Sequence, residues 1–98
     1  MKDNKVNVAV QVLPEGSRKE AYLIVDKVIE YIKSSGIKYK VCPFETVLEG
    51  DYDSIMNLVR GIPDICYNNG SGNIIMNLKI QASNENDVSI EDKMKYYE

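Results

Sequence analysis

Two stretches of this chain alternate strictly between apolar and more polar positions. Over residues 6–13 every second residue is valine, and over residues 73–81 isoleucine, methionine and leucine alternate with a more polar set. A period of two with β-branched residues is typical of β-strands. We therefore predict strands at 6–13 and 73–81, each with one fully apolar face and one mixed face.

The hydrophobic period changes to that of a helix after the first strand. Apolar residues from Ala21 to Ile32 recur at intervals of three and four, which indicates a helix with one buried side. Ser17 and Glu20 have the spacing of a capping box at its start, and Gly36 follows its end. The pattern predicts a helix from Ser17 to about residue 35.

A second helix is predicted between two further strands and the last one. Short strand patterns at 37–42 and 45–49 meet at Pro43-Phe44, and the alternating Lys38 and Lys40 favour a sheet edge. A helical pattern then begins at Asp51 and carries Gly61 and Pro63 within it. Because proline removes a helical hydrogen bond, we expect a kink or break near residues 60–63.

The order β-α-β-β-α-β predicts an α+β fold, a ferredoxin-like sandwich with a four-stranded antiparallel sheet. Residues 1–98 form one domain, with a core at 5–82, a tail at 83–98 and a short terminal helix at 89–97. Both main helices cover one sheet face, and the first and third strands lie inside. The opposite, mixed face has no covering element in this reading, which favours self-association into a homodimer or homotetramer.

Composition excludes several classes of function. The formal charge of −3 argues against a nucleic-acid partner, and the absence of histidine removes the usual zinc sites and histidine-dependent nucleophilic catalysis. No run is long enough to cross a membrane, and no apolar export segment precedes the first strand. With only Cys42 and Cys66, we expect free thiols and a cytoplasmic location.

The hairpin at 38–50 gathers more chemistry than any other stretch. Phe44, Glu45, Thr46 and Glu49 place an aromatic ring, a hydroxyl and two carboxylates within six residues. Glu45 and Glu49 share a strand face but lie about 13 Å apart, too far for a hydrolytic carboxylate pair. A phosphate-handling enzyme built on Arg18 has weak support, since the adjacent turn is not a glycine-rich cradle.

Short motifs along nearly the whole chain resemble the YkoF-like thiamine-binding family, whose single-domain members were long grouped under unknown function. The motifs are Val-Gln-Val-Leu-Pro (10–14), Ser-Gly-Ile-Lys-Tyr (35–39), Thr-Val-Leu-Glu-Gly (46–50), Ile-Met (55–56) and Val-Ser-Ile-Glu-Asp-Lys-Met-Lys-Tyr (88–96). The resemblance implies a ferredoxin-like fold, dimers or tetramers, and binding of thiamine or its hydroxymethylpyrimidine moiety without known catalysis. Many relatives have a small residue or a Met-Gly-like pair where this chain has Phe44-Glu45.

In that light, six residues are candidates for ligand contacts. Thr46 could hydrogen-bond an aminopyrimidine edge, Phe44 could stack on a ring, and the carboxylates could accept from an amine or offset a thiazolium charge. Across the mixed face, polar side chains from two strands could bind ligand or bond across a subunit interface. The full set is Gln11, Phe44, Glu45, Thr46, Glu49 and Asn77.

Two readings follow. The first is a cytoplasmic homo-oligomer that binds thiamine or a related aminopyrimidine, with no catalytic residue, metal or other cofactor. The alternative is a regulatory or structural oligomerisation module without a small-molecule ligand. The sequence leaves open which sheet face carries Thr46, whether the oligomer is a dimer or a tetramer, and whether binding serves transport, storage or sensing.

Overall fold

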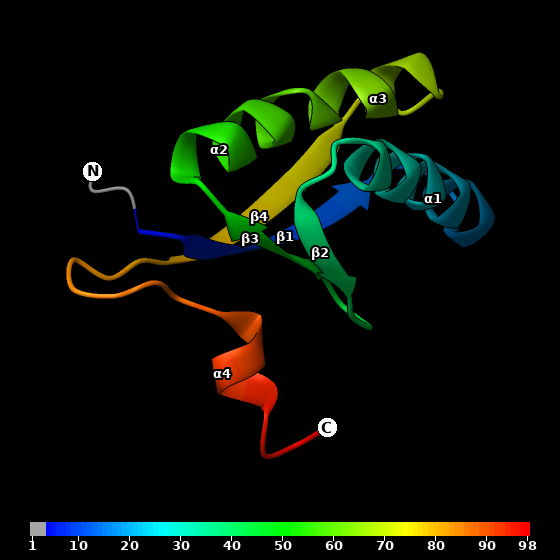
Figure 1. Cartoon of the computed structure of the whole chain (residues 1–98). Helices are drawn as coiled ribbons and strands as arrows, with labels where there is room; N and C mark the ends of the chain where they lie inside the picture. The colour runs from blue at the N-terminus through cyan, green and yellow to red at the C-terminus, as the bar shows by residue number, and fades with distance from the viewer. Residues whose placement is uncertain (1–3) are drawn as a thin grey trace.

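A computed structural model describes residues 4–98 of the chain. Along these residues the helices and strands follow the predicted order, with one helical region divided in two (Figure 1). The elements are β1 (Val6–Pro14), α1 (Arg18–Ser34), β2 (Lys38–Val41), β3 (Thr46–Gly50), α2 (Tyr52–Arg60), α3 (Ile62–Asn68), β4 (Ile74–Gln81) and α4 (Ile90–Met94).

The four strands form one sheet in the order β2-β3-β1-β4, and every neighbouring pair is antiparallel. This is the ferredoxin-like arrangement, so the predicted fold class and the inner positions of the first and third strands are confirmed. Register fixes which side chains share a face. Val8 lies opposite Leu48 of β3 and Ile80 of β4, while Ala9 lies opposite Val47 and Lys79.

The core lies between the sheet and the three helices α1, α2 and α3, which all cover the same face (Figure 1). The predicted valine face of β1 is buried there, together with the inner side of α1. On the valine face of β1 and the inner side of α1, six residues are at most 4% exposed: Val6, Val8, Val10, Ile24, Val28 and Ile32. The alternation of β1 and the helical stripe of α1 therefore meet as the sequence predicts.

The helix boundaries follow local chemistry. The Ser17 side chain accepts a hydrogen bond from the Glu20 amide while the Glu20 carboxylate accepts one from the Ser17 amide, which confirms the capping box. The predicted interruption is also present, because α2 ends at Arg60, Gly61 caps it, and α3 begins at Ile62 with Pro63 near its start. Proline is tolerated in a first helical turn, where its missing N–H has no partner to lose.

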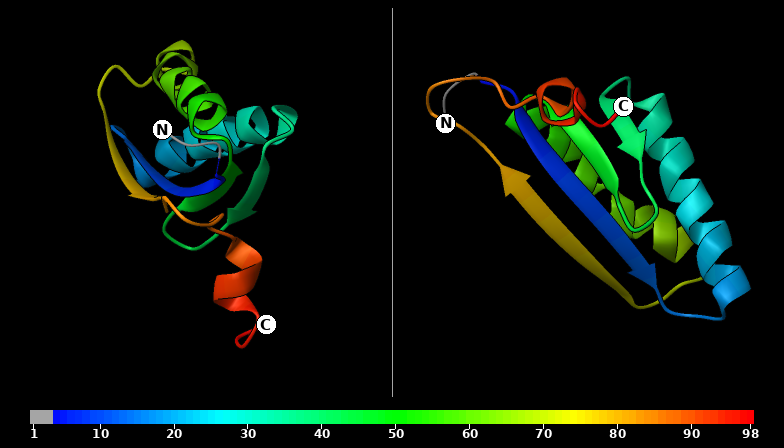
Figure 2. Two further views of the ribbon diagram at one scale, coloured as in Figure 1. Left: turned by 60° about the vertical axis from the view of Figure 1, so that its left-hand side comes forward. Right: turned by 90° about the horizontal axis from the view of Figure 1, so that it is seen from below.

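The expectation that the second sheet face has no covering element is wrong for one end of that face. Residues 82–98 turn back beneath the sheet, and α4 lies on the opposite side from the other helices (Figures 1 and 2). The Val88 amide donates to the Lys5 carbonyl at 2.9 Å, and Val88 is buried. The sequence pattern indicated the helix but not its position. The remainder of this open face still exposes Leu13 and Ile75, the latter by 62%.

Candidate functional site

The six residues proposed from the sequence lie in three different places. Thr46 pairs with Val10 and is buried on the helix side of the sheet, which settles the face that the sequence left open. The cross-strand partners Gln11 and Asn77, and with them Glu45 and Glu49, lie on the open face. Phe44 stands at the tip of the β2–β3 hairpin, 82% exposed. The structure therefore divides the proposed set between the two faces of the sheet and the tip of the hairpin.

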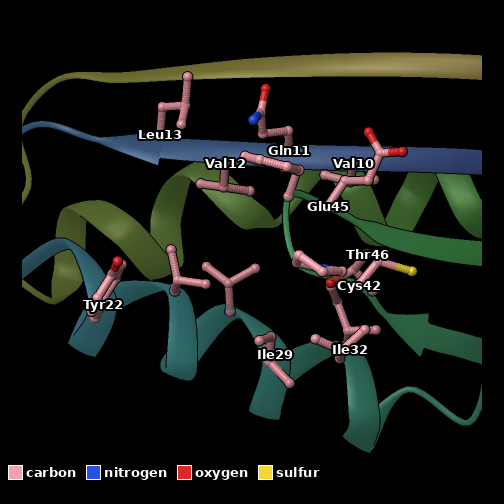
Figure 3. A pocket seen from close by; sticks show the side chains of 15 residues that line it. Val10, Gln11, Val12, Leu13, Tyr22, Ile29, Ile32, Cys42, Glu45 and Thr46 are labelled. Carbon is pink, nitrogen blue, oxygen red and sulfur yellow. The ribbon is translucent and has the colours of Figure 1, made fainter.

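A pocket of about 210 Å³ lies on the helix side, between α1, the second half of β1 and the β2–β3 hairpin (Figure 3). Most of its wall is aliphatic and is contributed by β1 and α1. The residues that line it are Val10, Gln11, Val12, Leu13, Tyr22, Val25, Val28, Ile29, Ile32, Val41, Cys42, Pro43, Phe44, Glu45 and Thr46. Four of the six proposed residues are among them.

Polar groups are few around this helix-side pocket and differ in where they point. Thr46 is 7% exposed and brings a hydroxyl group to the wall, and Tyr22 on α1 brings a phenol. Figure 3 shows the polar ends of Gln11 and Glu45 directed to the other side of β1 from α1. Those two residues therefore belong to the rim, and Thr46 and Tyr22 are the hydroxyl-bearing residues of the lining.

The open face carries its own polar cluster near the second half of β1. Asn77 donates to the Gln11 side-chain oxygen at 3.1 Å, and Glu45 forms an ion pair with Lys79 at 3.1 Å. Asn77 and Lys79 are exposed and Gln11 and Glu45 are partly exposed, so the mutual attraction of these groups contributes little to stability. They are available to a ligand or to a second subunit.

Glu49 has a different environment from the other proposed residues. Its carboxylate accepts hydrogen bonds from the Ile90 amide at 2.5 Å and from Asn7 at 3.3 Å, and Lys38 lies 3.3 Å away. Burial raises the pKa of this carboxyl, but the bonds from Ile90, Asn7 and Lys38 outweigh burial and hold the pKa below its usual value. These contacts join Glu49 to the C-terminal segment, and it does not line the helix-side pocket.

Sequence reasoning missed two groups of residues. Val25 and Ile29 were assigned to the core stripe of α1 but are half-buried and line the pocket, and helical spacing alone does not separate those roles. Asn7 was placed on the mixed face without a role. It is 3% exposed and donates to both Glu49 and the Val88 carbonyl. The sequence signal that could have indicated this role is the asparagine amide among the alternating valines of β1.

The pocket combines a mainly apolar lining with the Cys42 thiol and, at its rim, the Glu45 carboxylate. Within residues 4–98, no group of three or more metal-ligating side chains is close enough to hold a metal ion. Cys66 is buried in the core, where desolvation raises the pKa of its thiol. Arg18 is exposed at the first residue of α1 and does not line the pocket. What the site can do is enclose a small flat apolar group and orient it through Thr46.

The described residues form an antiparallel ferredoxin-like domain with a largely apolar pocket between sheet and helix, and known proteins share this fold. The profile of the thiamine-binding protein family matches residues 8–98. The chain therefore belongs to the thiamine-binding protein family. The structure also shows no helix within residues 4–98 that is long and apolar enough to span a membrane.

Relatives and solved structures support the same grouping. A UPF0045 protein of Clostridium perfringens is 38% identical over 93% of this chain and 95% of its own length. The Bacillus cereus structure of a domain of unknown function, DUF77, has a TM-score of 0.89 at 32% identity, covering 97% of this chain and 91% of that one. A Thermotoga maritima protein provisionally assigned to thiamine biosynthesis or salvage has a TM-score of 0.89 at 29% identity, covering 96% and 99%.

Proposed function

We propose that this protein binds thiamine or its hydroxymethylpyrimidine moiety in the helix-side pocket, without catalysing a reaction. The observation that carries the proposal is the pocket itself, a largely apolar slot whose lining includes the buried Thr46 hydroxyl and the Tyr22 phenol. Membership of the thiamine-binding family and the likeness to the Thermotoga maritima protein support the choice of ligand.

The size of the pocket favours the pyrimidine half of thiamine as the enclosed part. Pockets for drug-sized ligands usually measure about 300–1,000 Å³. At about 210 Å³, the helix-side pocket suits a single substituted ring. The thiazolium half would then extend toward the rim, where Phe44 and Glu45 stand.

Each rim and wall residue has a distinct part in this proposal. The Thr46 hydroxyl can donate to a ring nitrogen or accept from the exocyclic amine, and both are neutral hydrogen bonds. Phe44 can stack on a heteroaromatic ring or lie over a cationic one. Glu45 supplies negative charge for a thiazolium, in exchange for its exposed ion pair with Lys79.

Isothermal titration calorimetry with thiamine and hydroxymethylpyrimidine tests the proposal. Thr46→Val keeps the shape of the buried side chain and removes its hydroxyl. Loss of one neutral hydrogen bond worth about 1 kcal/mol weakens binding about fivefold. The matched control is Leu23→Ala, an exposed apolar residue of α1 outside the pocket. Absence of heat with both ligands, or equal affinities for wild type and Thr46→Val, would contradict the proposal.

We further propose that the protein is a cytoplasmic homo-oligomer that associates through the uncovered part of its open face. Leu13 and Ile75 are exposed there beside the Gln11–Asn77 pair, and contiguous exposed apolar residues mark interaction surfaces. The same observation supports the second candidate function, an oligomerisation module without a ligand. Native mass spectrometry separates the two, since it reports both subunit number and retained small molecules. Changes in sedimentation caused by Gln11→Ala and Asn77→Ala, without any ligand, would favour the second.

A further inference from the structure

The helix-side pocket touches the backbone edge of β1 as well as its side chains. Its lining includes four consecutive residues of the strand, Val10, Gln11, Val12 and Leu13. Neighbouring side chains in a strand point to opposite faces, and Figure 3 shows Gln11 and Leu13 on one side of β1 and Val12 on the side of α1. A pocket that reaches both sets therefore lies against the edge of the strand, in the space between β1 and the β2–β3 hairpin.

The register of the sheet shows where the backbone groups of Val12 point. The Glu15 amide donates to the Asn73 carbonyl at 2.9 Å, which continues the β1–β4 register by one residue. In antiparallel strands, pairs that exchange hydrogen bonds alternate with pairs that do not. The odd-numbered residues of β1 therefore bond to β4. The N–H and C=O groups of Val12 point to the other edge of β1, toward the hairpin.

No strand lies opposite Val12 at that edge. The β1–β3 pairing ends where Val10 lies opposite Thr46, which is the first residue of β3. The hairpin closes at this level, where the Cys42 amide donates to the Glu45 carbonyl at 2.9 Å. Within residues 4–98, no backbone hydrogen bond outside the strand ladders reaches Val12. The sheet therefore leaves one N–H and one C=O unpaired beside the pocket.

An unpaired strand edge selects the kind of ligand that can pair with it. Unpaired N–H and C=O groups on a strand are a template for a partner that offers an acceptor and a donor side by side. The exocyclic amine of an aminopyrimidine donates, and the ring nitrogen next to it accepts. A thiazolium ring has no N–H or O–H donor. The Val12 edge therefore favours the pyrimidine half of thiamine over the thiazolium half.

We propose that the backbone of Val12 determines the specificity of the helix-side pocket. Its N–H donates to a ring nitrogen of the ligand, and its C=O accepts from the adjacent exocyclic amine, so that the ligand pairs with β1 where β3 does not. This inference rests on the proposed function. It narrows the ligand to flat heteroaromatic rings that carry a donor beside an acceptor, and it leaves the Thr46 hydroxyl for a second polar group of the ring.

Amide hydrogen exchange of the unmodified chain, measured by NMR, tests both parts of this inference. In the free protein the amides of Gln11 and Leu13 bond to β4, so the unpaired Val12 amide between them should exchange at least about tenfold faster. Saturation with hydroxymethylpyrimidine should slow exchange at Val12 about fivefold or more relative to Gln11 and Leu13, as one neutral hydrogen bond implies. These two neighbours correct for any general stabilisation by the ligand.

Two further comparisons remove one hydrogen bond each. Val12→Pro deletes the N–H without breaking a bond to β4, and Pro14 already stands on the same edge of the strand. The matched control Val12→Ala also loses the valine side chain but keeps the N–H. Hydroxymethylpyrimidine should bind Val12→Pro about fivefold more weakly than Val12→Ala. On the ligand side, 2,4-dimethyl-5-hydroxymethylpyrimidine has a methyl group in place of the amine, and it should bind the wild type about fivefold more weakly than hydroxymethylpyrimidine.

Failure of this inference and failure of the proposed function give different results. Binding of hydroxymethylpyrimidine with unchanged relative exchange at Val12, or with equal affinity in Val12→Pro and Val12→Ala, would refute the pairing with Val12 and leave ligand binding intact. Slow exchange at Val12 in the free protein would refute it as well, since the edge would then have a partner within the chain. Absence of any binding by hydroxymethylpyrimidine would refute both the proposed function and the pairing.

Discussion

Replacing Glu49 by glutamine should release the C-terminal segment while leaving the core intact. The carboxylate accepts from the Ile90 amide and from Asn7, so it joins β3 to the start of α4 and to β1. Glutamine keeps the size and one acceptor oxygen but loses the charge. Its amide nitrogen would also meet the Lys38 ammonium, which the carboxylate now attracts at 3.3 Å.

The expected loss follows from the kinds of bond involved. A hydrogen bond to a charged group contributes about 1.5–3 kcal/mol and a neutral one about 0.5–1.5 kcal/mol, so each of two bonds weakens by about 1 kcal/mol. Burying a neutral glutamine costs less free energy than burying a carboxylate, and this difference offsets part of the loss. A net loss of about 1–2 kcal/mol corresponds to about 5- to 30-fold more frequent opening of the segment.

Native-state hydrogen exchange measures this opening directly, because local unfolding exposes amides independently of global unfolding. Protection at the amides of Val88 and Ile90 should fall about 5- to 30-fold in Glu49→Gln, while central amides of β1 keep theirs. The control is Glu45→Gln, which removes a more exposed carboxylate from the same strand face. Unchanged protection at Val88 and Ile90, or an equal loss in Glu45→Gln, would refute the role assigned to Glu49.

Three other predictions concern pH, packing and assembly. Because the pKa of Glu49 is held below its ordinary value of 4.5, its stabilising effect is complete above that value and is lost as the pH falls through the lower, folded-state pKa. Hydrogen exchange at the C-terminal segment, measured over an acid titration, should show this loss of protection. The pH dependence should be absent in Glu49→Gln. Gly61→Ala should lower the free energy of unfolding, measured in urea titrations, by about 1–3 kcal/mol, because a Cβ atom there would overlap the Tyr31 hydroxyl. The control Gly72→Ala places its Cβ atom in open space and should leave the free energy of unfolding unchanged. Ile75→Lys should dissociate the proposed oligomer in sedimentation velocity, and a similar mass in wild type and variant would argue against assembly through this face.

Much of the fold was predictable because its signals are local. The strand alternation, the capping box at Ser17 and Glu20, and the interruption at Gly61 and Pro63 each act within a few residues of the chain. The strand order followed from the number of elements and the handedness of their connections. These features depend on backbone chemistry that a single sequence displays.

The candidate site was less predictable because it depends on register and on contacts between distant segments. Thr46 and Glu49 are three residues apart, so alternation places them on opposite faces of β3, but only the register shows that Thr46 faces the helices. A shift of one residue in register would have exchanged those faces, and the sequence does not fix it. The bond from Ile90 to Glu49 joins residues 41 positions apart, so no local pattern could indicate that this carboxylate holds the C-terminal segment.

The central claim, that an aminopyrimidine ring occupies the helix-side pocket, is tested most directly by methyl NMR. Protein labelled at isoleucine and valine methyl groups is titrated with hydroxymethylpyrimidine, and contacts between ligand and protein protons are measured. The account predicts shifts and contacts at Val12 and Ile29, on either side of the pocket, and none at Val47 and Ile75 on the open face. Contacts at Val47 or Ile75 in place of Val12 and Ile29, or no shifts at all, would contradict it.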